Sequence, residues 1–250
     1  MAGHSKWAQI KHKKATVDAR RGQLFTKLAR AITVAARDGG GDPDGNAALA
    51  NAIEKAKSFR MPKENIERAI AKGTGEGADA AAIEAVTYEG YGPGGVAILV
   101  ECLTDNRNRT AAEIRHLFAR SDASLGEPGS VSWMFEKKGV VLVDGERYSE
   151  DDLIAAIDAG AEDVTSEGDS LRIVCDPASL QPVRESLEQS GVEVQSADLT
   201  MLPKTSVELG PDDARKLLRL MDGLDEHDDV DQVHANFDIR ADVLEEVAAT

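Results

Sequence analysis

The chain has 250 residues, 42% of them hydrophobic and only 4% aromatic, and it carries 29 Lys and Arg against 45 Asp and Glu, a net charge of −16. This length predicts two or three domains, with cores built from Ala, Val, Ile and Leu. The longest apolar runs are strand length and the amino terminus lacks an apolar signal stretch, so we expect no membrane contact and a cytoplasmic location. Cys102 and Cys175 lie in separate apolar runs and are expected to be reduced core residues.

Positive charge is concentrated at the amino-terminal end. Residues 1–37 hold nine basic side chains and one acidic one, Asp18, and a second acid, Asp38, follows directly. Residues 1–72 hold 15 basic and 7 acidic side chains, a net of +8, whereas the remaining 178 hold 14 and 38, a net of −24. A basic end on an acidic chain is typical of a surface for a polyanion, with nucleic acid the usual candidate.

The amino-terminal segment has the periodicity of a small helical bundle. Residues 1–16 show no clear period and are expected to form an extended or partly ordered arm. From 17 to 37 apolar residues recur at helical spacing and basic residues follow a neighbouring arc, which predicts a helix with one buried face and a basic stripe. Further helices are expected at 46–59 and 62–73, where Gly73 ends the bundle.

Beyond this bundle the apolar period shortens to two, which indicates strands. Residues 138–202 have the order strand, helix, strand, strand, helix, strand, which is a complete ferredoxin-like unit. Because a complete unit leaves no partner for its neighbours, the segments on either side should pair with each other. On those two sides we expect strands at 83–89, 95–103 and 130–135, a helix at 110–120, a helix at 214–221 and a strand at 233–239.

The predicted fold class is therefore α+β with three domains. The first is an amino-terminal three-helix domain, residues 1–77. The second is a discontinuous α/β middle domain, residues 78–137 plus 203–250. The third is a ferredoxin-like βαββαβ domain, residues 138–202, inserted into the second. The two ends of a ferredoxin-like unit can lie close together, which permits such an insertion.

The basic amino-terminal segment is the first candidate site. Ammonium groups neutralise phosphates and an exposed Trp can stack on a base. The alternative is a solvated helix end with the Trp packed on the bundle, and the acidity of the remaining chain favours the nucleic-acid contact. The candidate nucleic-acid-binding residues are His4, Ser5, Lys6, Trp7, Lys11, His12, Lys13, Lys14, Arg20, Arg21 and Lys27.

A second candidate is the segment Thr104-Asp-Asn-Arg-Asn-Arg-Thr, in which Arg107 and Arg109 precede a predicted helix. Two arginines at a helix amino terminus oppose its dipole, at a cost of up to roughly 1 kcal/mol. That placement favours a role such as gripping phosphate beside free backbone N–H groups. The alternative is a loop in which Thr110 caps the helix.

The remaining motifs favour structure over chemistry. The Gly-rich runs 73–77 and 92–95 lack the spacing of a phosphate loop and are expected to be linker or turn. The acidic stretch 222–231 lacks calcium-loop spacing and is expected to be a solvated loop. The histidines show no zinc spacing, and the sequence offers no set of nucleophile, base and orienting residue and no nucleophile elbow. We therefore expect a non-enzymatic protein with no metal and no cofactor.

Six blocks resemble the YebC/PmpR family and span the chain in the expected order. The family implies a helical amino-terminal domain followed by two α+β domains. The blocks are Met1-Ala-Gly-His-Ser-Lys-Trp-Ala-Gln-Ile-Lys-His-Lys-Lys, Asp18-Ala-Arg-Arg-Gly-Gln-Leu-Phe-Thr-Lys, Arg60-Met-Pro-Lys-Glu-Asn-Ile-Glu-Arg-Ala-Ile, Thr104-Asp-Asn-Arg-Asn-Arg-Thr, Gly129-Ser-Val-Ser-Trp-Met-Phe and Asn236-Phe-Asp-Ile.

The resemblance also implies a function. Bacterial relatives are classed as probable DNA-binding transcriptional regulators, a mitochondrial relative is a translational activator, and bacterial members are linked to ribosomes stalled at proline-rich sequence. The expectation is a nucleic-acid-binding regulator of gene expression whose partner is promoter DNA or ribosomal RNA. The alternatives are a ribosome-associated translation factor, which suits the net charge of −16, and a protein–protein adaptor. The oligomeric state is left open.

Overall fold

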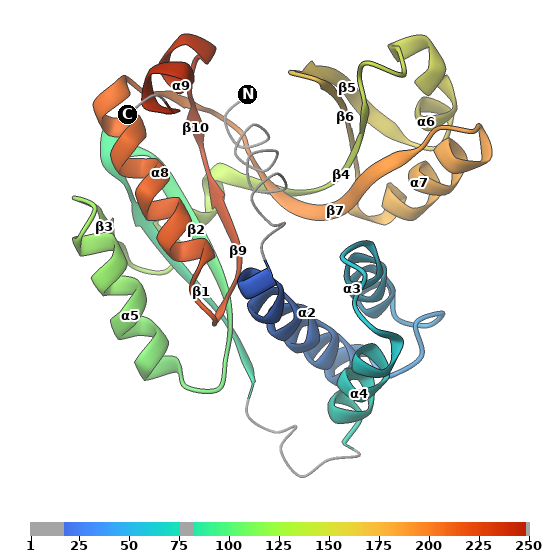
Figure 1. Cartoon of the computed structure of the whole chain (residues 1–250), viewed down its shortest axis with the longest axis horizontal. Helices are drawn as coiled ribbons and strands as arrows, with labels where there is room; N and C mark the ends of the chain where they lie inside the picture. Colours follow the sequence, from blue (N-terminus) through green and yellow to red (C-terminus); the bar gives the residue numbers. More distant parts are fainter. Residues whose placement is uncertain (1–17, 76–82, 249–250) are drawn as a thin grey trace.

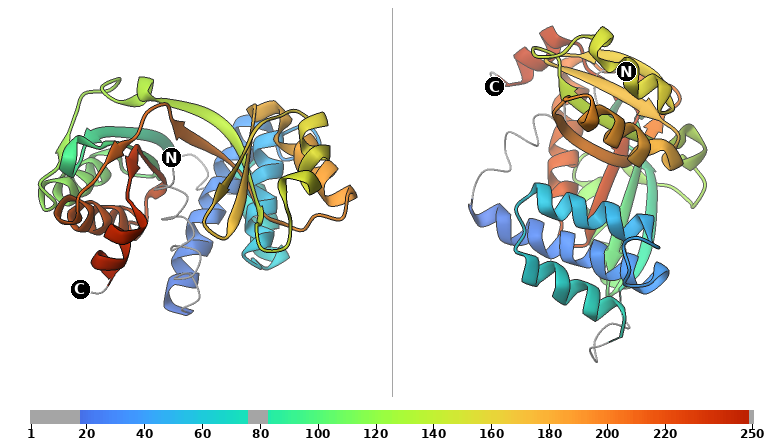
Figure 2. Two further views of the ribbon diagram at one scale, coloured as in Figure 1. Left: turned by 90° about the horizontal axis from the view of Figure 1, so that it is seen from above. Right: turned by 90° about the vertical axis from the view of Figure 1, so that its right-hand side faces the viewer.

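The computed structural model describes residues 18–75 and 83–248. These residues form three bodies, a helical one, a middle one and a ferredoxin-like one (Figure 1). Seen from above, the helical and ferredoxin-like bodies stack on each other beside the middle body (Figure 2). The expected α+β fold class is confirmed, with helices first and sheet-containing bodies after them.

The helical body consists of α2 (Asp18–Gly39), α3 (Ala47–Ser58) and α4 (Lys63–Gly73). Its core is aliphatic and includes the fully buried Ile32 and Leu49. Asn46 begins α3, because its Oδ1 accepts the Leu49 N–H at 3.1 Å while its Nδ2 donates to the Ala35 carbonyl at 2.8 Å. A β-carbon on Gly73 would collide with the Thr33 carbonyl, so this glycine lets α4 approach α2 closely.

The middle body is a four-stranded antiparallel sheet of order β3-β1-β2-β9. Helices α5 and α8 supply the residues that pack on its apolar face. Strand β9 pairs with β2, with Val233 opposite Val100, so the segments that flank the ferredoxin-like body do pair with each other. The elements are β1 (Glu84–Tyr91), η2 (Pro93–Gly95), β2 (Ala97–Thr104), α5 (Arg107–Ala119), β3 (Ser124–Leu125), β8 (Val207–Glu208), α8 (Pro211–Asp225), β9 (Val230–Ala235), β10 (Phe237–Asp238) and α9 (Ala241–Ala248).

The ferredoxin-like body has the expected βαββαβ order and an antiparallel sheet arranged β5-β6-β4-β7. A capping box between Ser149 and Asp152 starts its first helical segment. Its elements are β4 (Phe135–Asp144), η4 (Glu150–Leu153), α6 (Ile154–Asp158), β5 (Ala161–Glu167), β6 (Ser170–Cys175), η5 (Pro177–Ser179), α7 (Leu180–Gln189) and β7 (Val194–Pro203).

Both cysteines are buried and unbridged, as expected. Burial raises the pKa of the Cys102 thiol to about 12 and that of Cys175 to about 11. Thiols that are protonated at neutral pH are poor nucleophiles. In the part of the chain that is described, none of the helices is both long enough and apolar enough to cross a bilayer.

The strand expected at 130–135 is wrong. Residues Ser132–Met134 form the 3-10 turn η3, and β4 begins only at Phe135. The buried Glu89 carboxylate accepts the backbone N–H groups of Gly129, Val131 and Ser132 at 2.7, 2.7 and 2.8 Å, so these donors are not available to a sheet ladder. The domain limits given above stay a prediction.

Candidate nucleic-acid interface

Helix α2 is joined to the middle body through its basic face. The Arg30 guanidinium donates to Asp229 Oδ1 at 2.7 Å and to the Asp228 carbonyl at 2.9 Å. One turn earlier, Lys27 Nζ donates to the Asp225 carbonyl at 2.6 Å, and one turn before that Gln23 Nε2 donates to Asp228 Oδ1 at 3.1 Å. The amino-terminal half of α2 therefore lies against the acidic connection between α8 and β9.

Asp229 is the centre of this contact and is only 2% exposed. Its Oδ2 lies 2.8 Å from Arg109 Nη2 and 2.7 Å from the Thr110 hydroxyl. Burial raises the pKa of the Asp229 carboxyl, but the hydrogen bonds from Arg109, Thr110 and Arg30 outweigh it and hold the pKa at about 2. The expectation of a solvated acidic loop is wrong at this position, because two guanidiniums from other elements bind the carboxylate.

The Arg107–Arg109 segment is already part of α5. Helix α5 begins at Arg107, and its cap is Asn106, whose Oδ1 accepts the Arg109 N–H at 3.1 Å; Thr110 is not the cap. The Arg109 guanidinium is held by Asp229 and by Asp105, 2.9 Å away. Arg107 is exposed. The structure therefore gives Arg109 a bridging position, and the phosphate role of both arginines stays a prediction.

The other predicted site residues divide into three groups. Lys27 is half-buried in the contact with the middle body. Arg20 and Arg21 are placed by their backbone alone, in the first turn of α2. The rest lie outside the described residues, namely His4, Ser5, Lys6, Trp7, Lys11, His12, Lys13 and Lys14.

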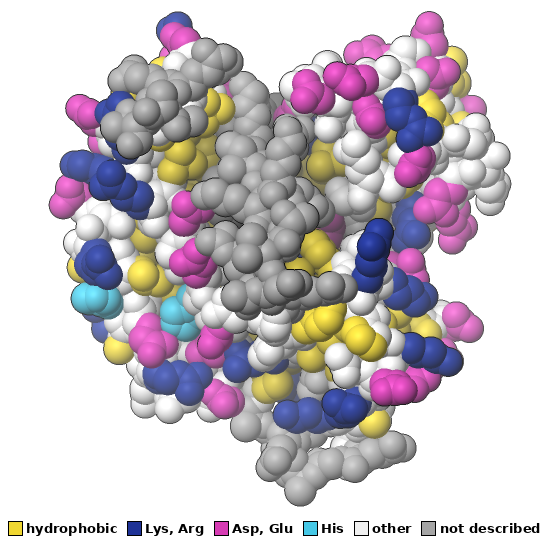
Figure 3. Space-filling view, in the orientation of Figure 1, with side chains coloured by type: hydrophobic (Ala, Val, Ile, Leu, Met, Phe, Trp, Pro, Cys, Tyr) yellow, Lys and Arg dark blue, Asp and Glu magenta, His cyan; other side chains and the backbone are white. Residues whose placement is uncertain are grey.

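The sequence prediction missed a set of exposed basic residues at the α3–α4 end of the helical body. Lys and Arg side chains are visible over these two helices in Figure 3. Two of them have helical partners, with Lys57 Nζ 2.6 Å from Glu54 and Lys63 Nζ 3.4 Å from Glu67. The net of +8 over residues 1–72 was the signal that could have found them. The set is Lys57, Arg60, Lys63, Arg68 and Lys72.

Arg60 is also conformationally unusual, because it adopts φ of 58° directly after the carboxyl end of α3. Its N–H donates to the Lys57 carbonyl at 2.8 Å, and the Met61 N–H donates to the Ala56 carbonyl at 2.9 Å. Glycine is the usual residue at such a helix end, since a side chain in the left-handed region costs roughly 1 kcal/mol or more. An exposed arginine kept at this cost marks the position as a candidate contact.

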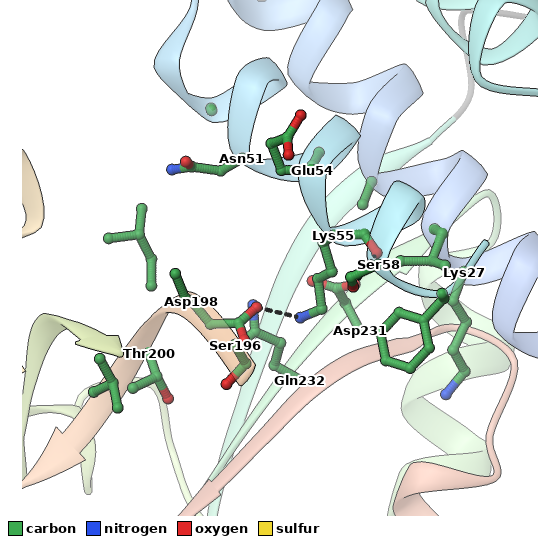
Figure 4. Close-up of a pocket in the computed structure, with 18 of the residues that line it drawn as sticks. Lys27, Asn51, Glu54, Lys55, Ser58, Ser196, Asp198, Thr200, Asp231 and Gln232 are labelled. Carbon is green, nitrogen blue, oxygen red and sulfur yellow. Dashed lines mark hydrogen bonds and ion pairs between the residues drawn. The ribbon is translucent and has the colours of Figure 1, made fainter. Parts of the chain in front are cut away.

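An open cleft of about 1220 Å³ lies where the three bodies meet. Helices α2 and α3 form one side and strands β7, β2 and β9 the other (Figure 4). Lys55 Nζ reaches across it to Asp198 Oδ1 at 3.2 Å. Burial lowers the pKa of Lys55, but the attraction of Asp198, Asp231 and Asp225 outweighs it and raises the pKa above its usual value, so Lys55 stays charged.

One cluster has the residue types of a metal site but not its chemistry. Ligand atoms of Glu113, His227 and Asp229 lie within 4.8 Å of one another. The His227 Nδ1 accepts the Asp229 N–H at 3.1 Å, which leaves the ring proton on Nε2, facing Glu113 at 2.9 Å. Because the Asp229 carboxylate also faces two arginines, a cation would meet a protonated nitrogen and two positive charges.

The fold and the placement of charge define a multi-body α+β protein with a basic helical end and no recognisable reactive centre among the residues described. The chain belongs to the TACO1/YebC family. The model for the "TACO1/YebC protein N-terminal domain" matches residues 5–76, and the model for the "TACO1/YebC second and third domain" matches residues 83–237.

Close relatives carry the name "Probable transcriptional regulatory protein". One from Rubrobacter xylanophilus is 54% identical over 249 residues, covering 99% of this chain and 100% of its own. Another from Thermobifida fusca is 51% identical over 249 residues, with 99% and 100% covered. The crystal structure of a conserved hypothetical protein from Aquifex aeolicus superposes with a TM-score of 0.85 at 48% identity, covering 94% of this chain and 97% of that one. These names support a regulatory role, and a transcriptional regulator is not an enzyme class.

Proposed function

We propose that this protein is a non-enzymatic regulator of gene expression that binds nucleic acid through its helical body and the basic segment before it. The observation that carries the proposal is the separation of charge, with a net of +8 over residues 1–72 and −24 over the rest. Phosphate attracts the first part and repels the second. The regulatory names of the relatives agree with this function.

The positions of the described side chains indicate which basic groups are available to contact phosphates. Lys27 and Arg30 point into the middle body, where they hold acidic residues. The exposed Arg60, Arg68 and Lys72 lie on α4 and the turn before it. We therefore propose that the nucleic acid lies along the α3–α4 end together with the segment from His4 to Lys14, while the acidic bodies face away.

DNA is the first candidate ligand, because the relatives are named probable transcriptional regulatory proteins and transcription acts on DNA. Ribosomal RNA is a second candidate, and the net of −24 over residues 73–250 favours it. A long duplex that lay along the molecule would be repelled by the two acidic bodies. A cleft lined by RNA admits the basic end alone, and the acidic bodies then remain outside or face basic ribosomal proteins.

The test is sedimentation of a cell lysate at moderate salt, with the full chain beside a variant carrying Lys11→Glu, Lys13→Glu and Lys14→Glu. A matched control carries Arg115→Glu, Arg120→Glu and Arg219→Glu, which changes the net charge equally at exposed positions of α5, its carboxyl-terminal cap and α8. Ribosome co-sedimentation lost only in the lysine variant supports the ribosomal function. Wild type in the light fractions, with salt-sensitive binding to promoter DNA, supports the transcriptional one. Binding to neither would overturn the proposal.

A further inference from the structure

The cleft between the three bodies has an apolar wall and an acidic end. Leu24 and Leu28 of α2 and Phe59 after α3 line one side, and Leu103 of β2 and Met201 of β7 line the other. At the end nearest the α8–β9 connection the lining includes five carboxylates against three ammonium groups, Lys27, Lys55 and Lys137. The five are Glu101, Asp222, Asp225, Glu226 and Asp231. A groove of this kind fits a segment that is both basic and partly apolar.

The chain carries such a segment directly before α2. Residues 1–17 include four lysines and no acidic residue, together with the apolar Trp7 and Ile10. Helix α2 begins at Asp18, and its contacts through Gln23 and Lys27 are with residues of the α8–β9 connection. Since an extended chain spans up to about 3.5 Å per residue, 17 residues could reach any part of the cleft.

We propose that the acidic end of this cleft is a docking site for the chain's own residues 1–17, and that nucleic acid must displace them. The inference rests on the proposed function, because the lysines of residues 1–17 would bind either the carboxylates of the cleft or the phosphates of nucleic acid. A tether this short gives an effective concentration on the order of millimolar, so even weak attraction populates the docked state. Nucleic-acid affinity is then reduced by the fraction of molecules in which the segment is docked.

Carbodiimide cross-linking of the full-length protein tests the docking itself. This reagent joins lysines to carboxylates that are in contact, and mass spectrometry identifies the pairs. We expect cross-links from Lys11, Lys13 or Lys14 to Asp222, Asp225 or Asp231. A mixture of isotopically light and heavy protein shows whether each cross-link joins one molecule. Cross-links that join light to heavy chains as often as chains of one isotope, or none from the segment to the cleft, would overturn the proposal.

Nucleic-acid binding tests the competition. The variant Asp222→Asn, Asp225→Asn, Asp231→Asn removes three negative charges from the cleft. Its control, Asp151→Asn, Asp163→Asn, Asp169→Asn, removes three from exposed positions of the ferredoxin-like body. We expect an oligonucleotide to bind the cleft variant about tenfold more tightly than the control, and to abolish the wild-type cross-links.

Fluorescence supplies a readout that does not depend on nucleic acid. The chain has two tryptophans, so Trp133→Phe leaves Trp7 as the single reporter. The cleft substitutions should shift Trp7 emission to the red, as the indole leaves an apolar wall, and the control substitutions should not. Cross-links and an emission shift without any nucleic-acid binding would support the docking while overturning the proposed function. Equal affinities and equal emission in the cleft and control variants would overturn the docking.

Discussion

Arg30 Nη1 lies 2.7 Å from Asp229 Oδ1, so an arginine of the basic helix α2 is bound to a buried carboxylate of the acidic middle body. The two residues are 199 positions apart in the chain. This pair, with Arg109 on the other carboxylate oxygen, fixes α2 to the middle body and leaves α3 and α4 to present their exposed basic residues. The arrangement leads to five predictions.

Replacing Asp229 by Ala should destabilise the protein by about 3–5 kcal/mol, because two arginines and two hydroxyls lose their shared acceptor. The neighbouring Asp228→Ala is the control, since that side chain is exposed and accepts one hydrogen bond from Gln23. Its effect should stay within about 0.5 kcal/mol. The free energy of unfolding from urea titration measures both. Equal losses would show that Asp229 does not stabilise the contact.

The same carboxylate predicts acid sensitivity. The folded state holds the Asp229 pKa at about 2, below the ordinary value of 3.8. A lowered pKa contributes stability that is present above the unfolded value and is lost as the pH falls through the folded one. The free energy of unfolding should therefore drop by about 2 kcal/mol between pH 4 and pH 2 because of this residue. Asp229→Asn should lack that part of the drop, and an unchanged pH profile would contradict the assignment.

Arg60→Gly should separate stability from binding. The glycine adopts φ near 58° without strain, so the free energy of unfolding should stay equal or rise by about 0.5–1 kcal/mol. Nucleic-acid affinity should fall, because one phosphate contact is lost. Arg60→Lys keeps the charge and should keep most of the affinity. Undiminished binding by the glycine variant would remove Arg60 from the interface.

Glu89→Gln should loosen the segment that precedes β4. The carboxylate accepts three backbone N–H groups, which lower its pKa against the opposing effect of burial. An amide would turn a donor toward at least one of them, at a cost of about 1–3 kcal/mol. Trp133 is 65% exposed, and its indole N–H donates to the Ser130 carbonyl, so its emission reports on this segment. Unchanged emission anisotropy in a Trp7→Phe background would contradict the prediction.

Periodicity was enough to predict the main elements of the fold. The ferredoxin-like order and the pairing of β2 with β9 follow from apolar spacing and from the need of each strand for a partner. The strand expected at 130–135 failed because Glu89, which binds its donors, lies 40 to 43 residues earlier. The sequence pattern around residues 130–135 does not reveal an acceptor that lies so far away along the chain.

The candidate site was harder to predict for the same reason. Asp229 sits among other acidic residues in the sequence, which favours a solvated loop, yet its partners Arg30 and Arg109 lie 199 and 120 positions away. The exposed basic residues of α3 and α4 are spread through ordinary amphipathic helices. Only their summed charge over residues 1–72 distinguishes them from any solvated surface.

The central claim is that phosphate is neutralised by the basic amino-terminal end, and the salt dependence of binding tests it most directly. Equilibrium binding of the full chain to RNA and DNA is measured across a series of salt concentrations, beside Lys13→Glu with Lys14→Glu. The variant should bind every sequence more weakly, and each lost contact should reduce the slope of log affinity against log salt by roughly 0.7–0.9. Unchanged affinity and slope would contradict the claim.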